Sequence, residues 1–338
     1  MTKQLTWLHK NLFSNWYNSL LTVISLVLLL WVAYGAIIWA TTQAQWAVVQ
    51  ANLHLFLVGR YPQSQYWRIW FVLAIIAILG TITATTFFGK QKLAIAKFIA
   101  PWLSLAWLLS FPVILWLIGG GFGLSSVPST LWNGLLLTLL MAAVSIVLSF
   151  PIGVLLALGR TSNLPVVRWF SILYIEIVRG VPLIGILFLA QVMLPLFLFA
   201  DVRLDRVVRA IAGLVLFSAA YMAENVRGGL QAVSRGQVEA AKALGLNTPL
   251  VVIFIVLPQA LRAVIPAIVG QFIGLFKDTS LLSLVGLVEL TGIARSILAQ
   301  PQFIGRYAEV YLFIGLIYWI FCYSMSLASQ RLEKQLSQ

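Results

Sequence analysis

The most regular feature of this chain is a series of long apolar segments separated by short polar stretches. Most of the segments reach the roughly 17–25 residues that an α-helix needs to cross the hydrocarbon core of a bilayer. The pattern therefore predicts about eight membrane-spanning helices. They are expected at Leu20–Ala40, Ile69–Thr85, Phe98–Ile118, Leu131–Leu158, Trp169–Phe199, Val207–Tyr221, Leu250–Phe276 and Ile304–Leu327.

The amino-acid composition supports an all-α integral membrane protein. Of 338 residues, 61% are hydrophobic and 9% are charged, whereas a soluble domain carries about 25% charged residues. A soluble domain must cover its exterior with polar groups, so this much apolar surface requires lipid as the solvent. The first segment, Leu20–Ala40, is longer than the ~7–15 apolar residues of a signal peptide, and we expect it to be a retained anchor.

The distribution of basic residues indicates which end of each span faces the cytoplasm, because cytoplasmic loops carry an excess of Lys and Arg. If the N-terminus is cytoplasmic, the cytoplasmic segments contain Lys3, Lys10, Lys90, Lys92, Lys97, Arg160, Arg168, Arg227, Arg235, Lys242, Arg331 and Lys334. The opposite segments contain fewer basic residues, so we expect both termini to be cytoplasmic. Since the basic residues are scattered singly between apolar runs, the net charge of +13 does not indicate nucleic-acid binding.

The sequence lacks the residues that a metal site, a phosphate-binding loop or a nucleotide site would need. Cys322 is the only cysteine, and His9 and His54 have no partner at ligand spacing, so we expect no metal site. Gly119–Gly123 shares only its glycines with a phosphate-binding loop, because no Lys-Ser/Thr follows it. No Walker A sequence occurs, so any ATP that is used must be bound by another subunit.

A short helix is predicted near the start of Ser234–Pro258, between two spans. Ser234 and Gln237 have the spacing of a capping box, and Gly245 suits the left-handed position that ends a helix. One apolar edge recurs at helical spacing, namely Val238, Ala241 and Leu244. A helix of about ten residues is ~15 Å long, which is too short to cross the membrane. Such a helix either joins two spans along the cytoplasmic surface or fits a groove on a soluble partner.

The same segment resembles the EAA signature of bacterial ABC importer permeases. Glu239-Ala240-Ala241 is followed after three residues by Gly245, and after nine more by Ile255-x-Leu257-Pro258. In that family the segment is the coupling helix, which docks on the ATPase subunit. The resemblance implies a coupling helix at 234–245 and ATPase-coupling roles for Ser234, Glu239, Ala240, Ala241, Gly245, Leu257 and Pro258.

Three neighbouring segments resemble the histidine/glutamine permease branch of this family, whose members carry polar amino acids. They are Tyr174–Leu183, with Val181 where threonine is usual, Ser218–Gly229 and Lys277–Leu281. The resemblance covers about residues 128–332, the five-span core of the family. Residues 1–127 would then form an N-terminal extension with three further spans.

The resemblance also implies the partners of the chain, in a bacterial inner membrane. An ABC ATPase dimer would use ATP and Mg, a second permease chain, homologous or identical, would complete the pathway, and a periplasmic or tethered binding protein would deliver the amino acid. This chain would bind no cofactor itself. The alternative function is a secondary amino acid transporter driven by an ion gradient, which would need midplane carboxylates or inverted repeats. A membrane enzyme would need a nucleophile–base or metal constellation, and none is evident.

Glu176 and Arg179 are candidates for the translocation pathway or its gate. They lie three residues apart within an apolar run, where charges are costly and are usually paired or line an aqueous path. The alternative is an intrahelical pair at the cytoplasmic interface, with Gly180 and Pro182 breaking the helix before the next span.

The second candidate for the pathway is Lys277-Asp278-Thr279-Ser280, which we expect in or near the outer mouth. Its charges and hydroxyls would suit a zwitterionic amino acid. The alternative is a capped turn, in which Asp278 or Thr279 starts a helix at Leu281.

Overall fold

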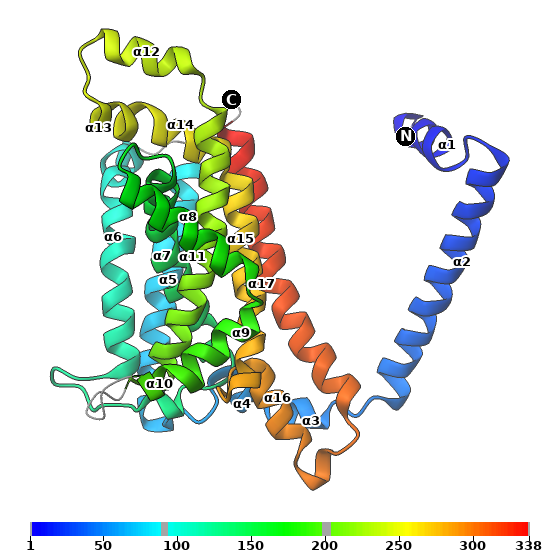
Figure 1. Cartoon of the computed structure of the whole chain (residues 1–338). Coiled ribbons are helices and arrows are strands. Elements are labelled where there is room, and N and C mark those ends of the chain that lie inside the picture. Colours follow the sequence, from blue (N-terminus) through cyan, green and yellow to red (C-terminus); the bar gives the residue numbers. More distant parts are fainter. Residues whose placement is uncertain (1, 89–93, 198–203, 337–338) are drawn as a thin grey trace.

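The protein is a bundle of long helices in the computed structural model, which describes residues 2–88, 94–197 and 204–336 (Figure 1). No β-strand occurs among these residues, which confirms the all-α fold class. The helices are α1 Thr2–Leu12, α2 Trp16–Ile38, α3 Ala47–Ala51, α4 Leu53–Val58, α5 Tyr66–Phe88, α6 Ala94–Gly119, α7 Gly134–Arg160, α8 Pro165–Gly180, α9 Leu183–Phe188, α10 Leu194–Phe197, α11 Arg206–Ala232, α12 Arg235–Ala243, α13 Thr248–Val251, α14 Leu257–Ala263, α15 Ile265–Asp278, α16 Leu290–Leu298 and α17 Tyr307–Leu336.

Six helical segments of the described chain are long and apolar enough to cross a membrane. They are Trp16–Gln43, Gln63–Thr86, Gly134–Arg160, Arg206–Ala232, Ile265–Val285 and Tyr307–Lys334. A seventh span results if α8 and the α9–α10 segment are counted together, and α6 is a further helix of 26 residues. The total of eight spans stays a prediction, and Lys90, Lys92 and Phe199 lie outside the described residues.

The predicted span Trp169–Phe199 is wrong as a single helix. α8 ends at Gly180, and the chain turns by 104° before α9 begins at Leu183. Val181 is extended, with φ −104° and ψ 135°, because a residue before proline is driven out of the helical region. The break that Gly180 and Pro182 indicate is therefore confirmed.

The predicted span Leu250–Phe276 also has the wrong bounds. It is interrupted at Val264, so that only the part from Ile265 onward belongs to a span. Pro266 has no N–H for the carbonyl four residues earlier, and its ring would clash with that carbonyl in a continuous helix. α13 and α14 instead lie across the end of the bundle below α12 (Figure 1).

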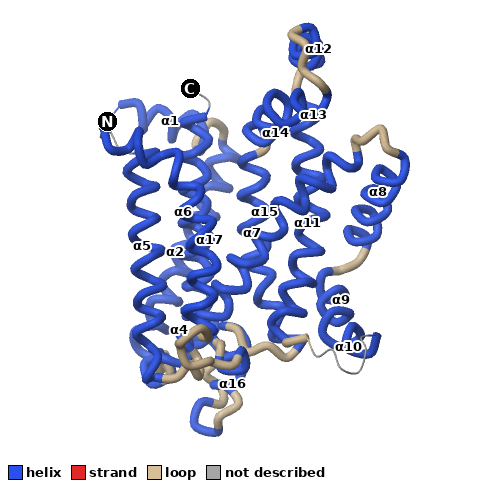
Figure 2. Tube along the Cα trace, turned by 90° about the vertical axis from the view of Figure 1, so that its left-hand side faces the viewer, coloured by secondary structure: helices blue, strands red, loops and turns tan. Residues whose placement is uncertain are grey.

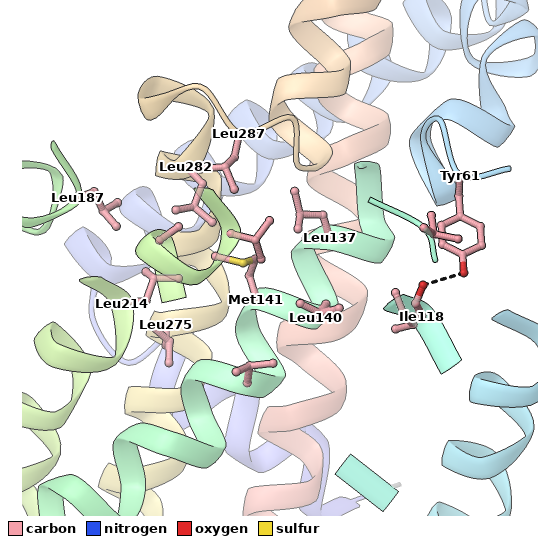
Figure 3. Packing of buried hydrophobic residues seen from close by; sticks show 14 of the residues in the cluster. Tyr61, Ile118, Leu137, Leu140, Met141, Leu187, Leu214, Leu275, Leu282 and Leu287 are labelled. Atoms are coloured by element: carbon pink, nitrogen blue, oxygen red, sulfur yellow. Dashed lines mark hydrogen bonds between the residues drawn. The ribbon is translucent and has the colours of Figure 1, made fainter. Parts of the chain in front are cut away.

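The centre of the bundle is built around α7 and α11. Figure 3 shows Leu137 and Met141 of α7 packed near Leu214, Leu275 and Leu282 from three later segments. Small residues let the helices approach closely, which is the usual device where lipid provides no hydrophobic drive between spans. At Gly153 of α7, an added Cβ would lie 2.5 Å from the Cβ of Met222 in α11.

The first two helices, α1 and α2, are attached to the bundle only beyond the end of α2. α2 has no buried residue and diverges from the other helices (Figure 1). The following segment packs against α16 and α17, where the N–H of Gln45 donates to Oε1 of the buried Glu309 at 2.9 Å. α1, α12 and the C-terminal end of α17 all lie at the opposite end of the molecule (Figures 1 and 2).

Gly229→Ala is expected to lower the free energy of unfolding. A Cβ at Gly229 in α11 would lie 2.3 Å from the carbonyl oxygen of Ala260 in α14, and overpacking of this kind costs about 1–3 kcal/mol. Gly228→Ala is the matched control, because no atom lies within 4 Å of its added Cβ. Thermal unfolding in detergent should separate the two variants, and equal melting temperatures would contradict the close contact between α11 and α14.

Candidate functional site

The predicted short helix exists as α12 and projects from the end of the bundle (Figure 1). Glu239 and Ala240 are exposed, whereas Ala241 is buried against the following segment. The predicted apolar edge is divided, because Val238 is half-buried and Leu244 is 83% exposed. Leu244 and Ala240 are four residues apart, so they form one outward apolar face.

The capping box predicted at the start of α12 is wrong. Ser234 is the N-cap, but its side chain makes no capping hydrogen bond. The backbone carbonyl of Ser234 accepts the N–H of Gln237 instead, at 3.1 Å. At the start of α13, the side chain of Asn247 does act as a cap and accepts the N–H of Leu250 at 3.1 Å.

The end of α12 matches the prediction for Gly245, which has a φ of +83°. The N–H of Gly245 donates to the carbonyl of Lys242 at 2.9 Å, and that of Leu246 donates to the carbonyl of Ala241 at 3.2 Å. These are the two hydrogen bonds of a Schellman motif, which requires a left-handed residue after the helix. Gly245 thereby fixes the direction in which the chain returns to the bundle.

Leu257 and Pro258 lie in α14, a surface helix, and not in a span. α12 packs against α13 and the π-helical turn Val252–Val256 that leads into α14. α14 in turn contacts α11 at the close approach of Gly229 and Ala260. The exposed α12 is therefore connected to α11, the central helix of the bundle, through α13 and α14.

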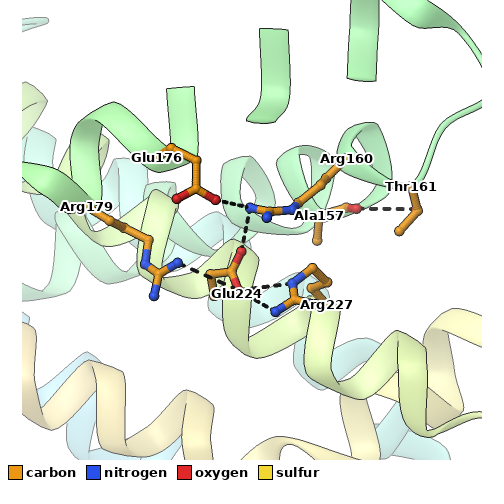
Figure 4. A network of polar contacts seen from close by, with 7 residues as sticks. All are labelled: Ala157, Arg160, Thr161, Glu176, Arg179, Glu224 and Arg227. Carbon is orange, nitrogen blue, oxygen red and sulfur yellow. Dashed lines mark hydrogen bonds and ion pairs between the residues drawn. The ribbon is translucent and has the colours of Figure 1, made fainter. Parts of the chain in front are cut away.

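A cluster of five charged side chains joins α7, α8 and α11 (Figure 4). Glu224 of α11 is at its centre, with its carboxylate 2.8 Å from both Arg160 and Arg227 and 3.7 Å from Arg179. Arg160 also pairs with Glu176 at 2.9 Å. Glu224 is mostly buried, so its negative charge holds three cations at the junction of three helices.

The intrahelical pair considered as the alternative for Glu176 and Arg179 does not form. Each side chain binds a residue of another helix, Arg160 of α7 for Glu176 and Glu224 of α11 for Arg179. The Arg179 guanidinium also lies 5.6 Å from the centre of the Tyr221 ring. Sequence reasoning missed the central role of Glu224, although it is an isolated acid within an apolar span and such residues are rarely without function.

The capped turn considered as the alternative at Lys277–Ser280 does not form either. α15 continues to Asp278 and passes directly into a 3₁₀ helix, Thr279–Val285, within the span Ile265–Val285. Asp278 makes no capping bond, and the hydroxyl of the buried Thr279 donates back to the carbonyl of Phe276 at 2.6 Å. Lys277 is exposed, whereas Asp278 and Ser280 are half-buried.

Glu289 is a buried carboxyl group that sequence reasoning did not single out. It lies between the spans Ile265–Val285 and Tyr307–Lys334 and caps α16, accepting the N–H groups of Thr291 at 2.8 Å and Gly292 at 3.0 Å. The Tyr318 hydroxyl donates to it at 3.1 Å. Burial raises the pKa of Glu289 to about 7, although these hydrogen bonds act in the opposite direction. The signal in the sequence was an acid directly before a short apolar helix.

An apolar cleft of about 390 Å³ lies along α8 to α11. Its walls include Val181, Ile186, Met193, Phe197 and Leu216. A zwitterionic ligand would lose its hydration there without gaining hydrogen bonds. This cleft is therefore unsuited to a polar amino acid.

Comparison with known proteins reveals one family. Residues 149–338 match the family model described as binding-protein-dependent transport system inner membrane component. The chain is 41% identical to the inner membrane amino-acid ABC transporter permease protein YhdY of Escherichia coli (strain K12), over 99% of this chain and 93% of that protein. It is 35% identical to the glutamate/glutamine/aspartate/asparagine transport system permease protein BztC of Rhodobacter capsulatus, over 98% and 93%.

Among the solved structures that resemble part of the fold is an amino acid transporter. It is described as the crystal structure of an amino acid ABC transporter with histidines and is 30% identical to this chain. The similarity covers 60% of this chain and 92% of that chain, with a TM-score of 0.54.

Glu224→Gln is expected to destabilise the junction of α7, α8 and α11, because three guanidinium groups lose their shared counter-ion. Removing one partner of a buried ion pair costs about 3–5 kcal/mol, and an exposed pair contributes about 0–1 kcal/mol. We expect about 2 kcal/mol here, since Glu224 is 16% exposed. Glu176→Gln is the control: that side chain is 55% exposed and pairs with Arg160 alone among the ion pairs of the described chain. Thermal unfolding should show the larger loss for Glu224→Gln, and the reverse order would contradict its central position.

Glu289→Gln is expected to flatten the pH dependence of stability. With its pKa raised from 4.5 to about 7, the folded carboxyl keeps a proton that the unfolded chain releases. The stability that this proton contributes is complete below the unfolded pKa and is lost as the pH rises through the folded pKa. Melting temperatures measured from pH 4.5 to 8 should fall more steeply for the unmodified protein than for Glu289→Gln. Parallel curves would show that Glu289 titrates normally.

Proposed function

The chain belongs to the family of binding-protein-dependent transport system inner membrane components and is the permease subunit of an amino-acid ABC importer, and from this premise we infer that α12 is where a separate ATPase drives transport. Family membership favours this function over an ion-gradient-driven secondary transporter. The observation that carries the inference is the exposed helix α12, closed at Gly245 and connected to the bundle through α13 and α14.

The outward face of α12 has the properties of a docking element. Ala240 and Leu244 offer a small apolar surface, and Glu239 is exposed beside them. A helix with such a face fits a groove on a soluble protein. Docking can drive a change of conformation only if the ATPase binds one state of the permease more tightly than the other.

Force received at α12 has a short route into the spans. α12 contacts α13 and the turn into α14, and α14 contacts α11 at Gly229. Glu224 lies on α11 about one and a half turns before Gly229, and it binds arginines of α7 and α8. We therefore assign Leu257 and Pro258, in α14, to the transmission of this force. Glu176 and Arg179 belong to a junction that would change when α11 moves, which fits a gate at this end of the pathway.

Lys277 supports a pathway between two permease chains. Its side chain is exposed within a span, and a charge at membrane depth is usually paired or faces water. The apolar cleft along α8 to α11 cannot serve a polar substrate. We propose that a second permease chain, homologous or identical, covers the face of the bundle that carries Lys277. Lys277, Asp278 and Ser280 then lie along the route of a polar amino acid, and the buried Thr279 fixes the backbone between them.

The remaining partners follow from the same proposal. Two ATPase subunits bind ATP and Mg and dock on the two α12 helices, while this chain binds no cofactor. A periplasmic or tethered binding protein delivers the amino acid at the opposite end. Because α1 and the end of α17 lie at the α12 end, both termini are cytoplasmic in this arrangement.

The decisive experiment is ATP-driven amino acid uptake by the complete transporter in proteoliposomes. Gly245→Ala introduces a Cβ at φ +83°, and the left-handed conformation costs about 1–2 kcal/mol in such a residue. We expect this strain to be relieved by loss of the docked geometry of α12. ATP-driven uptake should then fall about tenfold, since about 1.4 kcal/mol corresponds to that factor. Glu239→Lys should also lower uptake, by reversing the charge on the docking face.

Gly245→Asn is the matched control, because asparagine adopts the left-handed conformation more readily than alanine. It should retain more uptake than Gly245→Ala. Co-purification of the ATPase tests the docking itself. If Gly245→Ala and Glu239→Lys both left uptake and co-purification unchanged, α12 would not be the coupling element.

A further inference from the structure

The loop that follows α6 is a tight hairpin with an aromatic residue at its tip. Gly121 and Leu124 exchange two backbone hydrogen bonds, of 3.0 and 3.1 Å, so Phe122 and Gly123 are the central residues of a two-residue turn. Their φ angles are +48° and +94°, as a type I′ turn requires. Asparagine, aspartate and glycine are the usual residues in such a turn, and Phe122 is the one non-glycine residue with positive φ in the described chain. Its side chain is 99% exposed.

The base of the hairpin is held firmly. The Trp116 indole N–H donates to the carbonyl of Gly121 at 2.7 Å, and the Tyr61 hydroxyl donates to that of Ile118 at 3.0 Å (Figure 3). Arg68 is 1% exposed and donates to the carbonyl and hydroxyl of Ser125, at 2.9 and 2.8 Å. The strained turn is therefore presented by a rigid support, and the Phe122 ring is almost fully exposed beyond it.

Exposed aromatic residues mark the same edge of the bundle. Trp67, Trp70 and Phe71 lie in the first turns of α5 and are 43%, 70% and 58% exposed. Trp116 lies in the last turn of α6, which packs against α5. Tryptophan is enriched where spans meet the membrane–water interface. The ends of α5 and α6 therefore indicate the level of that interface.

The position of the hairpin favours lipid over a protein partner. In Figure 1 the teal loop extends sideways from the foot of α6, away from the bundle and at the end opposite α12. Residues 119–130 contain no charged side chain, so they can lie among headgroups without burying a charge. A soluble partner that covers a central pathway would approach from beyond the bundle and not from its side.

We propose that the Gly119–Leu124 hairpin is a membrane-interface anchor that holds the Phe122 ring among the lipid headgroups and the first acyl carbons. Trp70, near the start of α5, and Trp116, near the end of α6, extend this contact. The anchor fixes the depth of the α5–α6 pair in the bilayer, and it is independent of the role assigned to α12.

The test places a fluorescent label at the tip of the hairpin in the full chain. Phe122→Cys in a Cys322→Ala background is labelled with an environment-sensitive thiol reagent and placed in phosphatidylcholine–phosphatidylglycerol nanodiscs. Quenching by lipid spin-labelled at acyl carbon 5 is compared with quenching by iodide in water. Gln302→Cys is the control, because Gln302 is an exposed polar residue of the 3₁₀ turn Pro301–Phe303 before α17. The Phe122 label should respond mainly to the lipid quencher and the Gln302 label mainly to iodide.

A second label tests the phenylalanine ring itself. Ser126→Cys reports on the same loop, and Phe122→Asn keeps the turn geometry while it removes the ring. Lipid quenching of the Ser126 label should fall by about half or more when Phe122→Asn is added. If the Phe122 label is quenched by iodide as strongly as the Gln302 label, the hairpin extends into water and the proposal is overturned. Unchanged quenching of the Ser126 label would likewise show that the ring anchors nothing.

Discussion

At Gly229 the backbone of α11 lies against the carbonyl of Ala260 in α14, so closely that an added Cβ would be 2.3 Å from that oxygen. Two backbones in such contact have no side chain between them to absorb a displacement, and close-packed interiors transmit strain. A movement of α14 must therefore displace α11. The carboxylate of Glu224 then passes the displacement on, because it binds arginines of α7 and α8. The remainder of the proposed mechanism depends on this sequence of contacts.

Two breaks between helices allow the helices along this route to reorient. One lies between α8 and α9, and the other lies at Val264 between α14 and α15. Non-helical backbone at membrane depth is tolerated only where its polar groups find partners or water. At Val264 the N–H still donates to the carbonyl of Leu261, at 3.2 Å. The helices on the two sides of such a break can change their relative angle without losing their internal hydrogen bonds.

The apolar segments and the Glu239–Gly245 signature predicted most of the spans and the position of α12, because both depend on residues close together in sequence. The breaks were less predictable. Pro151 lies inside α7 without ending it, whereas Pro266 accompanies a break only two residues earlier. Whether a proline interrupts a span depends on neighbouring helices that satisfy the freed carbonyl, and those neighbours are distant in sequence.

The charged cluster escaped prediction for the same reason. The spacing of Glu176 and Arg179 indicates that they share one face of α8, but not which helices lie against that face. Arg160 and Glu224 are 64 residues apart, and only the packing of α7 on α11 brings them together. The side-chain capping bond predicted for Ser234 is absent for a local reason, because the backbone carbonyl of Ser234 accepts the N–H of Gln237.

The attachment of α2 at one end only leaves the α12 end of the bundle free to move. The backbone groups in the interior of a helix are satisfied within the helix, so α2 needs no protein contact to be stable in lipid. It is tied to the core beyond its far end, where Gln45 binds Glu309 and the next residues pack on α16 and α17. A displacement that begins at α12 reaches α14 and α11 first, on the opposite side of the membrane from this attachment. α2 therefore adds a membrane-embedded helix without stiffening the junction on which coupling depends.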